Sequence, residues 1–456
     1  MDDLPEGLDE TYERILKEIR KPNQKHAHRM LQCLVAAVRP LRVEELAEVL
    51  AFDFDVEGIP KLNPDWRWEQ QEEAIILACS SLVTIVEDEK SRIVQFSHFS
   101  VKEFLTANRL ANPVRDISRY HIQLDAAHTI LAQACLGVIF RIDDHISQDT
   151  VKKSFPLALY AGRYWMTHAQ FETVSSRIKD GMKRLFDADQ PYFAIWLWLH
   201  DGDLTIFQTL SSMFPQKPEA VPLYYAAKFG FRDLAEHLIA EHPEYLNARG
   251  GFHNTPIHAA AYEGHTDILT LLLDHGVDIN DRNKSGETPL RIASSSGHLE
   301  AGWYLIDRGA DINAADDGKN TIVSRAFRGH VESIRKLIRL GAVIDIRNSN
   351  GENSLHMSVR SGSLELVRLY LDLGLDPNLP NYWDDTPYDL ALKCGHPDVL
   401  ELLIEYGATC PDPKVCYYSH LGPIIRVRAD GTLYPDYRGM RPGIPHRCPE
   451  LENANN

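Results

Sequence analysis

The sequence predicts a mainly α-helical protein with a mixed N-terminal region, a helical connector and a C-terminal solenoid of repeated helix pairs. Two observations predict this class. Glycines recur with a period of about 33 residues over the last half of the chain, and the N-terminal part combines amphipathic segments with one pair of β-rich runs. With 456 residues the chain is too long for one core, so we expect two or three folding units.

The first 111 residues have the element order of a winged helix. One helical face carries Leu8, Tyr12, Ile15, Leu16 and Ile19, and further helices are expected at 26–38, 44–51 and 69–82, the last with Ala74, Leu77 and Ala78 inward. The runs 82–86 and 93–96 predict a β-hairpin, and residues 100–103 predict a capping box that opens another helix.

We expect a helical connector at 112–220 and an irregular, proline-rich tail at 411–456. The apolar stretch 126–140 is short for a bilayer and contains His128 and Gln133, so a buried helix is predicted there. The tail carries five scattered Cys and His residues whose spacing matches no compact zinc module, and no metal site is expected: Cys410, Cys416, His420, His446 and Cys448.

The repeat region, at 221–410, should contain about six units. One glycine series is 264, 297, 329, 362 and 395, and a second series with the same intervals is 276, 309, 341, 374 and 407. Thr-Pro pairs at 255, 288 and 386 supply an N-cap hydroxyl followed by proline at the first helical position. Each unit is therefore a short helix, a glycine turn, a leucine-bearing second helix and a glycine stop.

The strings TPIHAAAYEGH at 255–265 and GADIN at 309–313 closely resemble the ankyrin consensus. Two units depart from it. The third reads NTIVSRA from Asn320, with Arg325 where the family prefers a small residue, and the fourth reads NSLHMS from Asn353. We expect these units to be locally strained or less stable.

The resemblance implies a concave binding face built from first helices and turn tips. On the first helices it selects Tyr262, Glu263, Ser295, Ser296, Phe327, Arg328, Arg360, Ser361 and Lys393. At the tips it selects Arg282, Lys284, Asp316, Asp317, Asn348, Asn350, Tyr382, Trp383 and Asp384. Tyr382 and Trp383 are the first choice for an interface anchor, with local packing against Pro380 and Pro387 as the alternative.

Residues 4–16, 39–46, 79–83 and 98–105 resemble the winged-helix region that follows the nucleotide-binding NACHT module in nucleotide-switch receptors of fungi. Such receptors often end in ankyrin repeats, and residues 156–168 resemble their helical connector. No phosphate-binding Gly-x-x-x-x-Gly-Lys-Ser/Thr loop occurs in this chain. The chain is therefore expected either to be a separate protein or to be part of a longer one.

Composition excludes several other functions. The net charge is −17, no Lys/Arg-rich run occurs, and residues 1–111 carry 14 basic and 21 acidic residues, a balance of −7, so we expect neither nucleic acid nor an anionic membrane as a partner. No nucleophile elbow, His-Glu-x-x-His or dinucleotide motif is present, so neither catalysis nor a cofactor nor a small-molecule substrate is expected.

Seven cysteines without framework spacing, and no secretory signal at the N-terminus, suggest a reduced intracellular protein, cytoplasmic with the nucleus not excluded.

The resulting prediction is a non-catalytic scaffold that binds another protein, and the resemblance implies a role in intracellular signalling or non-self recognition. The first alternative is the sensor or effector half of a NACHT receptor whose NTPase lies outside this chain. A winged-helix nucleic-acid binder is a further alternative.

Overall fold

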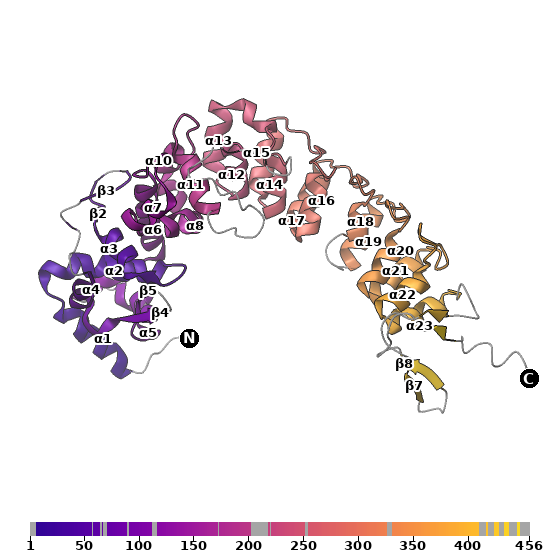
Figure 1. Cartoon of the computed structure of the whole chain (residues 1–456), viewed down its shortest axis with the longest axis horizontal. Helices are drawn as coiled ribbons and strands as arrows, with labels where there is room; N and C mark the ends of the chain where they lie inside the picture. Colours follow the sequence, from indigo (N-terminus) through magenta and orange to yellow (C-terminus); the bar gives the residue numbers. More distant parts are fainter. Residues whose placement is uncertain are drawn as a thin grey trace, which may run out of the picture. The chain divides into compact units, whose positions relative to one another are not determined.

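The computed structural model describes residues 6–56, 58–63, 66, 71–88, 91–111, 116–171, 173–201, 218, 220–250, 254–325 and 331–409, and the strand segments 416–417, 424–427, 433–436 and 445–446. The chain divides into two compact units, residues 1–245 and 246–456 (Figure 1). The fold is mainly helical, with small sheets in the N-terminal part.

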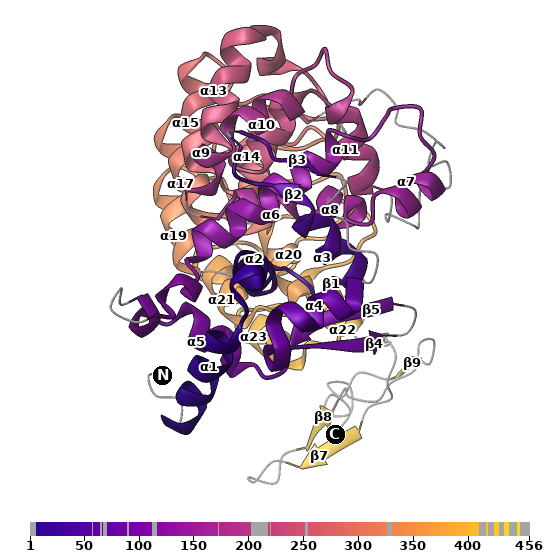
Figure 2. The ribbon, with the colours of Figure 1, turned by 90° about the vertical axis from the view of Figure 1, so that its left-hand side faces the viewer.

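A three-stranded sheet in the order β1-β5-β4 forms the strand part of the winged helix. The predicted hairpin is confirmed, because β4 and β5 pair antiparallel with Val83 opposite Phe96 and Asp88 opposite Ser91. Figure 2 shows the hairpin beside α4, and α1 beside α5. The elements are α1 (Glu6–Glu18), α2 (Gln24–Ala36), β1 (Leu41–Arg42), α3 (Val43–Leu50), β2 (Phe52–Asp53), β3 (Lys61–Leu62), α4 (Gln71–Cys79), β4 (Val83–Asp88), β5 (Ser91–Phe96) and α5 (Ser100–Thr106).

Two local predictions in this region are wrong. Leu77 was expected inside, but its side chain is 74% exposed, and Ile75, Ala78 and Cys79 form the buried stripe of α4. Ser100 does not cap α5. It is the first helical residue, and its hydroxyl instead lies 2.7 Å from the Tyr12 hydroxyl and 2.5 Å from Nδ1 of His98, which lies two residues before it.

The connector helices pack around α6, which contacts α2 and α8. The buried helix predicted over 126–140 is present in α6, whose inner residues are almost fully buried. Within the described part of the chain, no helix has both the length and the apolar character needed to cross a bilayer. The helices are α6 (Leu124–Ile139), α7 (Gln148–Ser154), α8 (Ala158–Ala169), α9 (Val174–Arg177), α10 (Lys179–Leu185) and α11 (Tyr192–Asp201).

Helices α12 (Pro222–Lys228) and α13 (Arg232–Glu241) also belong to the first unit. Aromatic rings join them to the connector. Trp165 of α8 stacks on Phe231, and Trp196 of α11 meets Tyr225 edge-on at 5.5 Å between ring centroids. Both tryptophans are fully buried, so this aromatic cluster forms the core that holds α12 and α13 to the connector.

The second unit consists of consecutive helix pairs. The first helices pack on one another in order, and the second helices pack beside them (Figure 1). The first helices are α14 (Pro256–Glu263), α16 (Pro289–Ser296), α18 (Ile322–Arg325), α20 (Ser354–Ser361) and α22 (Pro387–Cys394). The second helices are α15 (Thr266–Asp274), α17 (Leu299–Asp307), α19 (Val331–Arg339), α21 (Leu364–Asp372) and α23 (Pro397–Glu405).

Caps and glycines set this period as predicted. Thr288 and Thr386 accept the N3 backbone N–H of their helices. The fourth full unit lacks Thr-Pro. Its Asn353 side chain accepts the backbone N–H groups of Leu355 and His356, and the first helix of this unit is therefore still capped. Gly264 ends α14 at φ +80°, and a Cβ there would lie 2.6 Å from Nδ1 of His298 in the next pair, so glycine is required twice over.

In the tail, which was predicted to be irregular, the structure describes four short strands. They form two antiparallel pairs, β6 with β9 and β7 with β8. Their bounds are β6 (Cys416–Tyr417), β7 (Ile424–Val427), β8 (Leu433–Asp436) and β9 (Pro445–His446). Cys410, His420 and Cys448 lie outside the described residues.

Candidate protein-binding face of the repeat unit

Each link between helix pairs in the second unit is closed by one Asn or Asp side chain. Asn283 Oδ1 accepts the backbone N–H groups of Ser285 and Glu287, both at 2.9 Å. Asp316, Asn348 and Asn381 stand at the equivalent place in the next links, at the same intervals as the glycines. Asn348 was expected to protrude, but it is only 5% exposed because this turn uses its side chain. Asn or Asp recurs at these four positions of the sequence, and this spacing is a signal from which the turns could be predicted.

Neighbouring tips are joined edge to edge by backbone hydrogen bonds. Asp317 N–H donates to Ser285 O at 3.0 Å, Ser349 N–H donates to Gly318 O at 2.7 Å, and Tyr382 N–H donates to Asn350 O at 3.0 Å. These bonds link four successive tips into one row, defined here as the tip row (281–287, 316–320, 348–352 and 381–385). The row fixes the backbone from which the candidate side chains project.

The predicted binding residues stand on the last turns of the first helices or in the tip row. Twelve of the described ones are exposed, Glu263, Ser296 and Asp316 are half-buried, and Asn348 is buried. Phe327 and Arg328 lie outside the described residues. The exposed set is Tyr262, Arg282, Lys284, Ser295, Asp317, Asn350, Arg360, Ser361, Tyr382, Trp383, Asp384 and Lys393. Their role in binding stays a prediction.

Some cations in this set already have internal partners. Arg360 donates from Nε and Nη2 to Oε1 of the buried Glu352, at 2.8 and 2.6 Å, and this hydrogen bond raises the pKa of Arg360. Lys393 of α22 pairs with Asp385, in the tip that leads into that helix. Both residues therefore tie a tip to its helix. Lys284 is exposed and has no ion pair within the described residues, so it is freer to meet a partner.

Tyr382 and Trp383 form an exposed aromatic pair at the end of the tip row. Their side chains are 65% and 60% exposed, so local packing against the neighbouring prolines does not bury them. The Tyr382 ring lies against Gly351, where a Cβ would come within 2.7 Å of it, and the Arg347 guanidinium sits 5.3 Å from the ring centroid. The backbone N–H of Trp383 donates to Asn381 Oδ1 at 2.9 Å. The pair is exposed, but its backbone is fixed.

Two family models match the chain. The model described as ankyrin repeats (3 copies) matches residues 223–316 and 322–413, and the model described as GPI inositol-deacylase, winged helix domain, matches residues 12–114. The chain is an ankyrin-repeat protein with an N-terminal winged-helix domain.

Three similarities illustrate its relations. The Azaphilone pigments biosynthesis cluster protein L of Monascus ruber is 31% identical over 294 residues, which is 60% of this chain and 60% of that protein. The mouse Protein phosphatase 1 regulatory subunit 27 is 43% identical over 82 residues, or 18% of this chain and 53% of that protein. The human ASB11 ankyrin repeat domain aligns at 25% identity and a TM-score of 0.37, covering 46% of this chain and 89% of that one. The chain thus spans about three fifths of the Monascus protein.

The buried histidines of the ankyrin repeats serve the backbone. Nε2 of His258 lies 3.1 Å from Asp281 O and 3.2 Å from Glu287 O, so it donates, and Nδ1 accepts the Thr255 backbone N–H at 3.3 Å. Burial lowers the pKa of His258 and of His356, which occupies the same place in a later repeat. These hydrogen bonds connect the start of a first helix to the link that follows the helix pair, so the two histidines stabilise the repeat.

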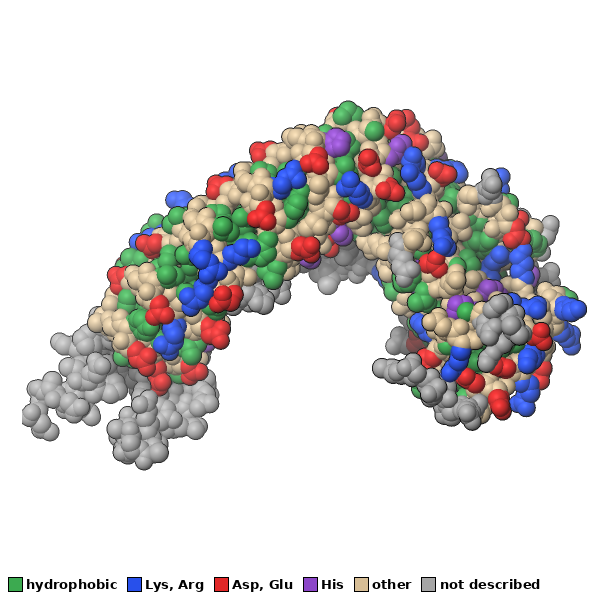
Figure 3. All heavy atoms as spheres, turned by 180° about the vertical axis from the view of Figure 1, so that it is seen from behind, with side chains coloured by type: hydrophobic (Ala, Val, Ile, Leu, Met, Phe, Trp, Pro, Cys, Tyr) green, Lys and Arg blue, Asp and Glu red, His purple; other side chains and the backbone are tan. Residues whose placement is uncertain are grey.

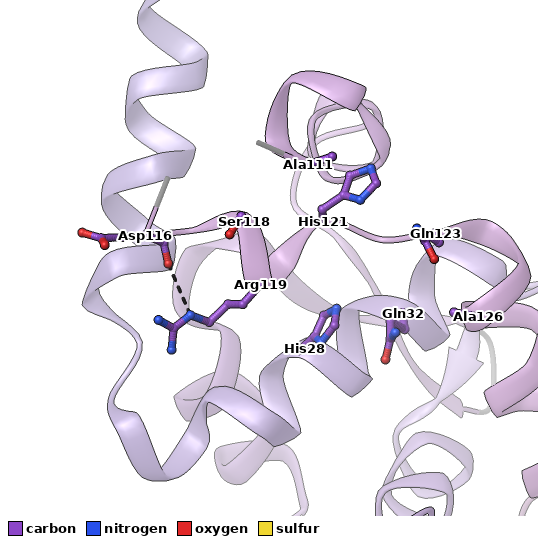
Figure 4. A pocket seen from close by; sticks show the side chains of 9 residues that line it. All are labelled: His28, Gln32, Ala111, Asp116, Ser118, Arg119, His121, Gln123 and Ala126. Carbon is purple, nitrogen blue, oxygen red and sulfur yellow. Dashed lines mark hydrogen bonds between the residues drawn. The ribbon is translucent and has the colours of Figure 1, made fainter. Parts of the chain in front are cut away.

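An open hollow of about 730 Å³ lies in the first unit, between α2 and the segment that leads to α6 (Figure 4). Arg119 Nε donates to Asp116 O at 3.3 Å, and the His121 ring points toward Ala111, away from His28 (Figure 4). No hydrogen bond joins Ser118 to either histidine among the described residues. Residues 112–115 are outside the described residues, and no nucleophile and base are assembled in the described lining of the hollow.

A buried chain of polar groups crosses the first unit. Val38 N–H donates to the Tyr160 hydroxyl at 3.2 Å, so that hydroxyl donates its own hydrogen to Nε2 of His168 at 2.9 Å. His168 therefore carries its hydrogen on Nδ1 and donates it to Nδ1 of His128 at 2.8 Å. His168 is fully buried, and desolvation lowers its pKa to about 3. The neutral form of His168 completes the chain.

The first unit is expected to lose stability as the pH falls below 6.5. The folded pKa of His168 lies near 3 and the unfolded value near 6.5, so between these pH values the unfolded chain binds one more proton. The free energy of unfolding should drop by about 1 kcal/mol per pH unit across this window from His168 alone. Urea titrations at several pH values would measure the slope, and His168→Gln should flatten it by about one proton. An unchanged slope in the variant would contradict this assignment.

Proposed function

We propose that this ankyrin-repeat protein is a non-catalytic scaffold whose first-helix and tip-row face binds a partner protein, in intracellular signalling or non-self recognition. The ankyrin repeat domain is generally a protein-interaction module. The observation that carries the proposal is the exposed Tyr382–Trp383 pair on a backbone held by hydrogen bonds on both sides. Exposed aromatics on a preorganised backbone are favoured anchors, because binding costs them little conformational entropy.

The side chains of helix α4 argue against DNA binding by the winged-helix domain. Helix α4 presents Glu72 and Glu73 at its start, and its exposed apolar residues are Ile76 and Leu77. Glu72 is paired with Arg92 of the hairpin, so that cation is already engaged. A phosphate backbone would meet carboxylates and apolar side chains where it needs free cations.

The test is a direct binding measurement with a partner first identified by cross-linked affinity capture. Replacing both Tyr382 and Trp383 by alanine should weaken binding by about 2 kcal/mol, roughly 30-fold in Kd. Phe99→Ala is the matched control, because Phe99 is a 71% exposed aromatic in the other unit. Circular dichroism would confirm that both variants fold.

A second variant tests whether binding depends on where the Tyr382 ring lies, and not only on the presence of the two aromatic side chains. Gly351→Ala keeps both rings but puts a methyl group where the Tyr382 ring now lies, so it should also weaken binding. If the double alanine variant binds as tightly as the parent, or if Phe99→Ala has the same effect, the tip row is not the partner site.

A further inference from the structure

Helix α19 reverses a charge pattern that the other second helices share. Those helices end on Asp274, Asp307, Asp372 and Glu405, whereas α19 ends on Arg339 at the equivalent place. Its exposed side also carries Arg335 and Lys336, which lie on the same helical face as Arg339, against one acidic residue, Glu332. In a chain of net charge −17 this basic strip (Arg335, Lys336 and Arg339) is a local exception.

The strip is not neutralised by its own surroundings. Arg335 is 3.7 Å from the Glu332 carboxylate, and both side chains are exposed, so this pair is weak. Lys336 Nζ lies 3.9 Å from the ring centroid of Trp303, a contact that keeps its charge. Arg339 has no ion pair within the described residues. Three cations are therefore available on one surface.

An apolar groove of about 260 Å³ runs between the strip and α21. Val331, Leu364 and Leu369 supply its apolar lining, and Leu364 is 38% exposed, so part of this lining meets solvent. Arg335 from α19 and Arg368 from α21 stand on its two sides. Figure 3, which views the molecule from behind, shows Lys and Arg side chains gathered next to hydrophobic ones on the repeat unit.

We propose that this groove is a second docking surface and that it takes an acidic amphipathic helix of a partner protein. An apolar side chain of that helix enters the groove, and Asp or Glu residues one turn away lie over the basic strip. The chemistry favours a protein helix over a nucleic acid, because Glu365 and Asp372 also line the groove and would repel a continuous phosphate backbone. The surface lies on the second helices, so the proposal stands apart from the tip row.

The test uses fluorescent synthetic peptides and the full chain. One peptide of roughly 14 residues, about four helical turns, carries Leu and Glu at amphipathic spacing. A scrambled peptide has the same composition, and a third has Lys in place of Glu. Fluorescence anisotropy should show saturable micromolar binding of the first peptide only, and at least about 10-fold weaker binding of the other two.

Variants locate the binding on this surface. Arg335→Glu combined with Arg339→Glu should weaken the acidic peptide about 10-fold or more, whereas Arg282→Glu with Lys284→Glu in the tip row should leave it unchanged. Leu364→Ser tests the groove itself and should also weaken binding. Equal binding of the scrambled peptide, no saturable binding, or an equal effect of the tip-row variant would overturn the proposal. Tip-row binding of the captured partner would be unaffected by any of these outcomes.

Discussion

Replacing Trp196 by alanine is expected to lower the free energy of unfolding of the first unit by about 3–5 kcal/mol. Trp196 is completely buried, and its ring lies 5.6 Å from that of Trp165 and 5.4 Å from that of Phe186, centroid to centroid. Its indole N–H donates to Gly162 O at 3.2 Å. Alanine would remove these ring contacts and leave a cavity that the stiff aromatic neighbours cannot fill.

The consequence should reach α12 and α13, since Trp196 also contacts Tyr225 and Phe229 of that segment. Urea titration read by hydrogen exchange of peptides from the first unit would measure the loss. Trp383→Ala is the matched control, because that tryptophan is 60% exposed and its removal should change stability by less than about 0.5 kcal/mol. A loss below about 1 kcal/mol for Trp196→Ala would mean that the aromatic cluster is not the core described here.

Arg291→Ala is expected to destabilise the second unit by about 3–5 kcal/mol. Arg291 is 4% exposed and donates from Nε and Nη2 to Oδ2 of Asp316, at 3.2 and 2.9 Å. The Asp316 side chain is 11% exposed. Its Oδ1 accepts the backbone N–H of Asn320 and so closes the tip at 316–320. Removing the guanidinium would leave a carboxylate away from water with hydrogen bonds but no counter-charge.

Two companion variants identify the cause. Arg308→Ala breaks the exposed pair with Asp274 and should change the stability far less than Arg291→Ala does, because solvent screens that pair. Adding Asp316→Asn to Arg291→Ala should recover part of the stability, because the amide keeps the turn without the charge. Thermal unfolding followed by circular dichroism would compare the three. A double variant less stable than Arg291→Ala alone would show that the stranded charge is not the cause.

Local signals account for what the sequence predicted. The two glycine series and the Thr-Pro caps act within one repeat, so they foretold the helix pairs, and the polar residues between two β-rich runs foretold the hairpin of β4 and β5. The inner face of α4 was misassigned because Ala74 to Ala78 are all apolar, and so periodicity alone could not choose between Ile75 and Leu77.

Long-range partners account for what the sequence did not predict. Ser100 fits a capping pattern, but its hydroxyl is used by Tyr12, which lies 88 positions away. The pairing of Arg291 with Asp316 crosses between repeats, and no local pattern marks it. On the candidate binding face the positions followed from repeat register, whereas the placement of the Tyr382 ring depends on Gly351 and Arg347 in the preceding link.

We propose that partners bind the face formed by the first helices and the tip row. Amide hydrogen exchange of the full chain, with and without its captured partner, tests it most directly. Binding is expected to slow exchange at 281–287, 316–320, 348–352 and 381–385, most strongly around Tyr382 and Trp383. Protection confined to the winged-helix domain and connector, with the tip row exchanging as in the free chain, would contradict it.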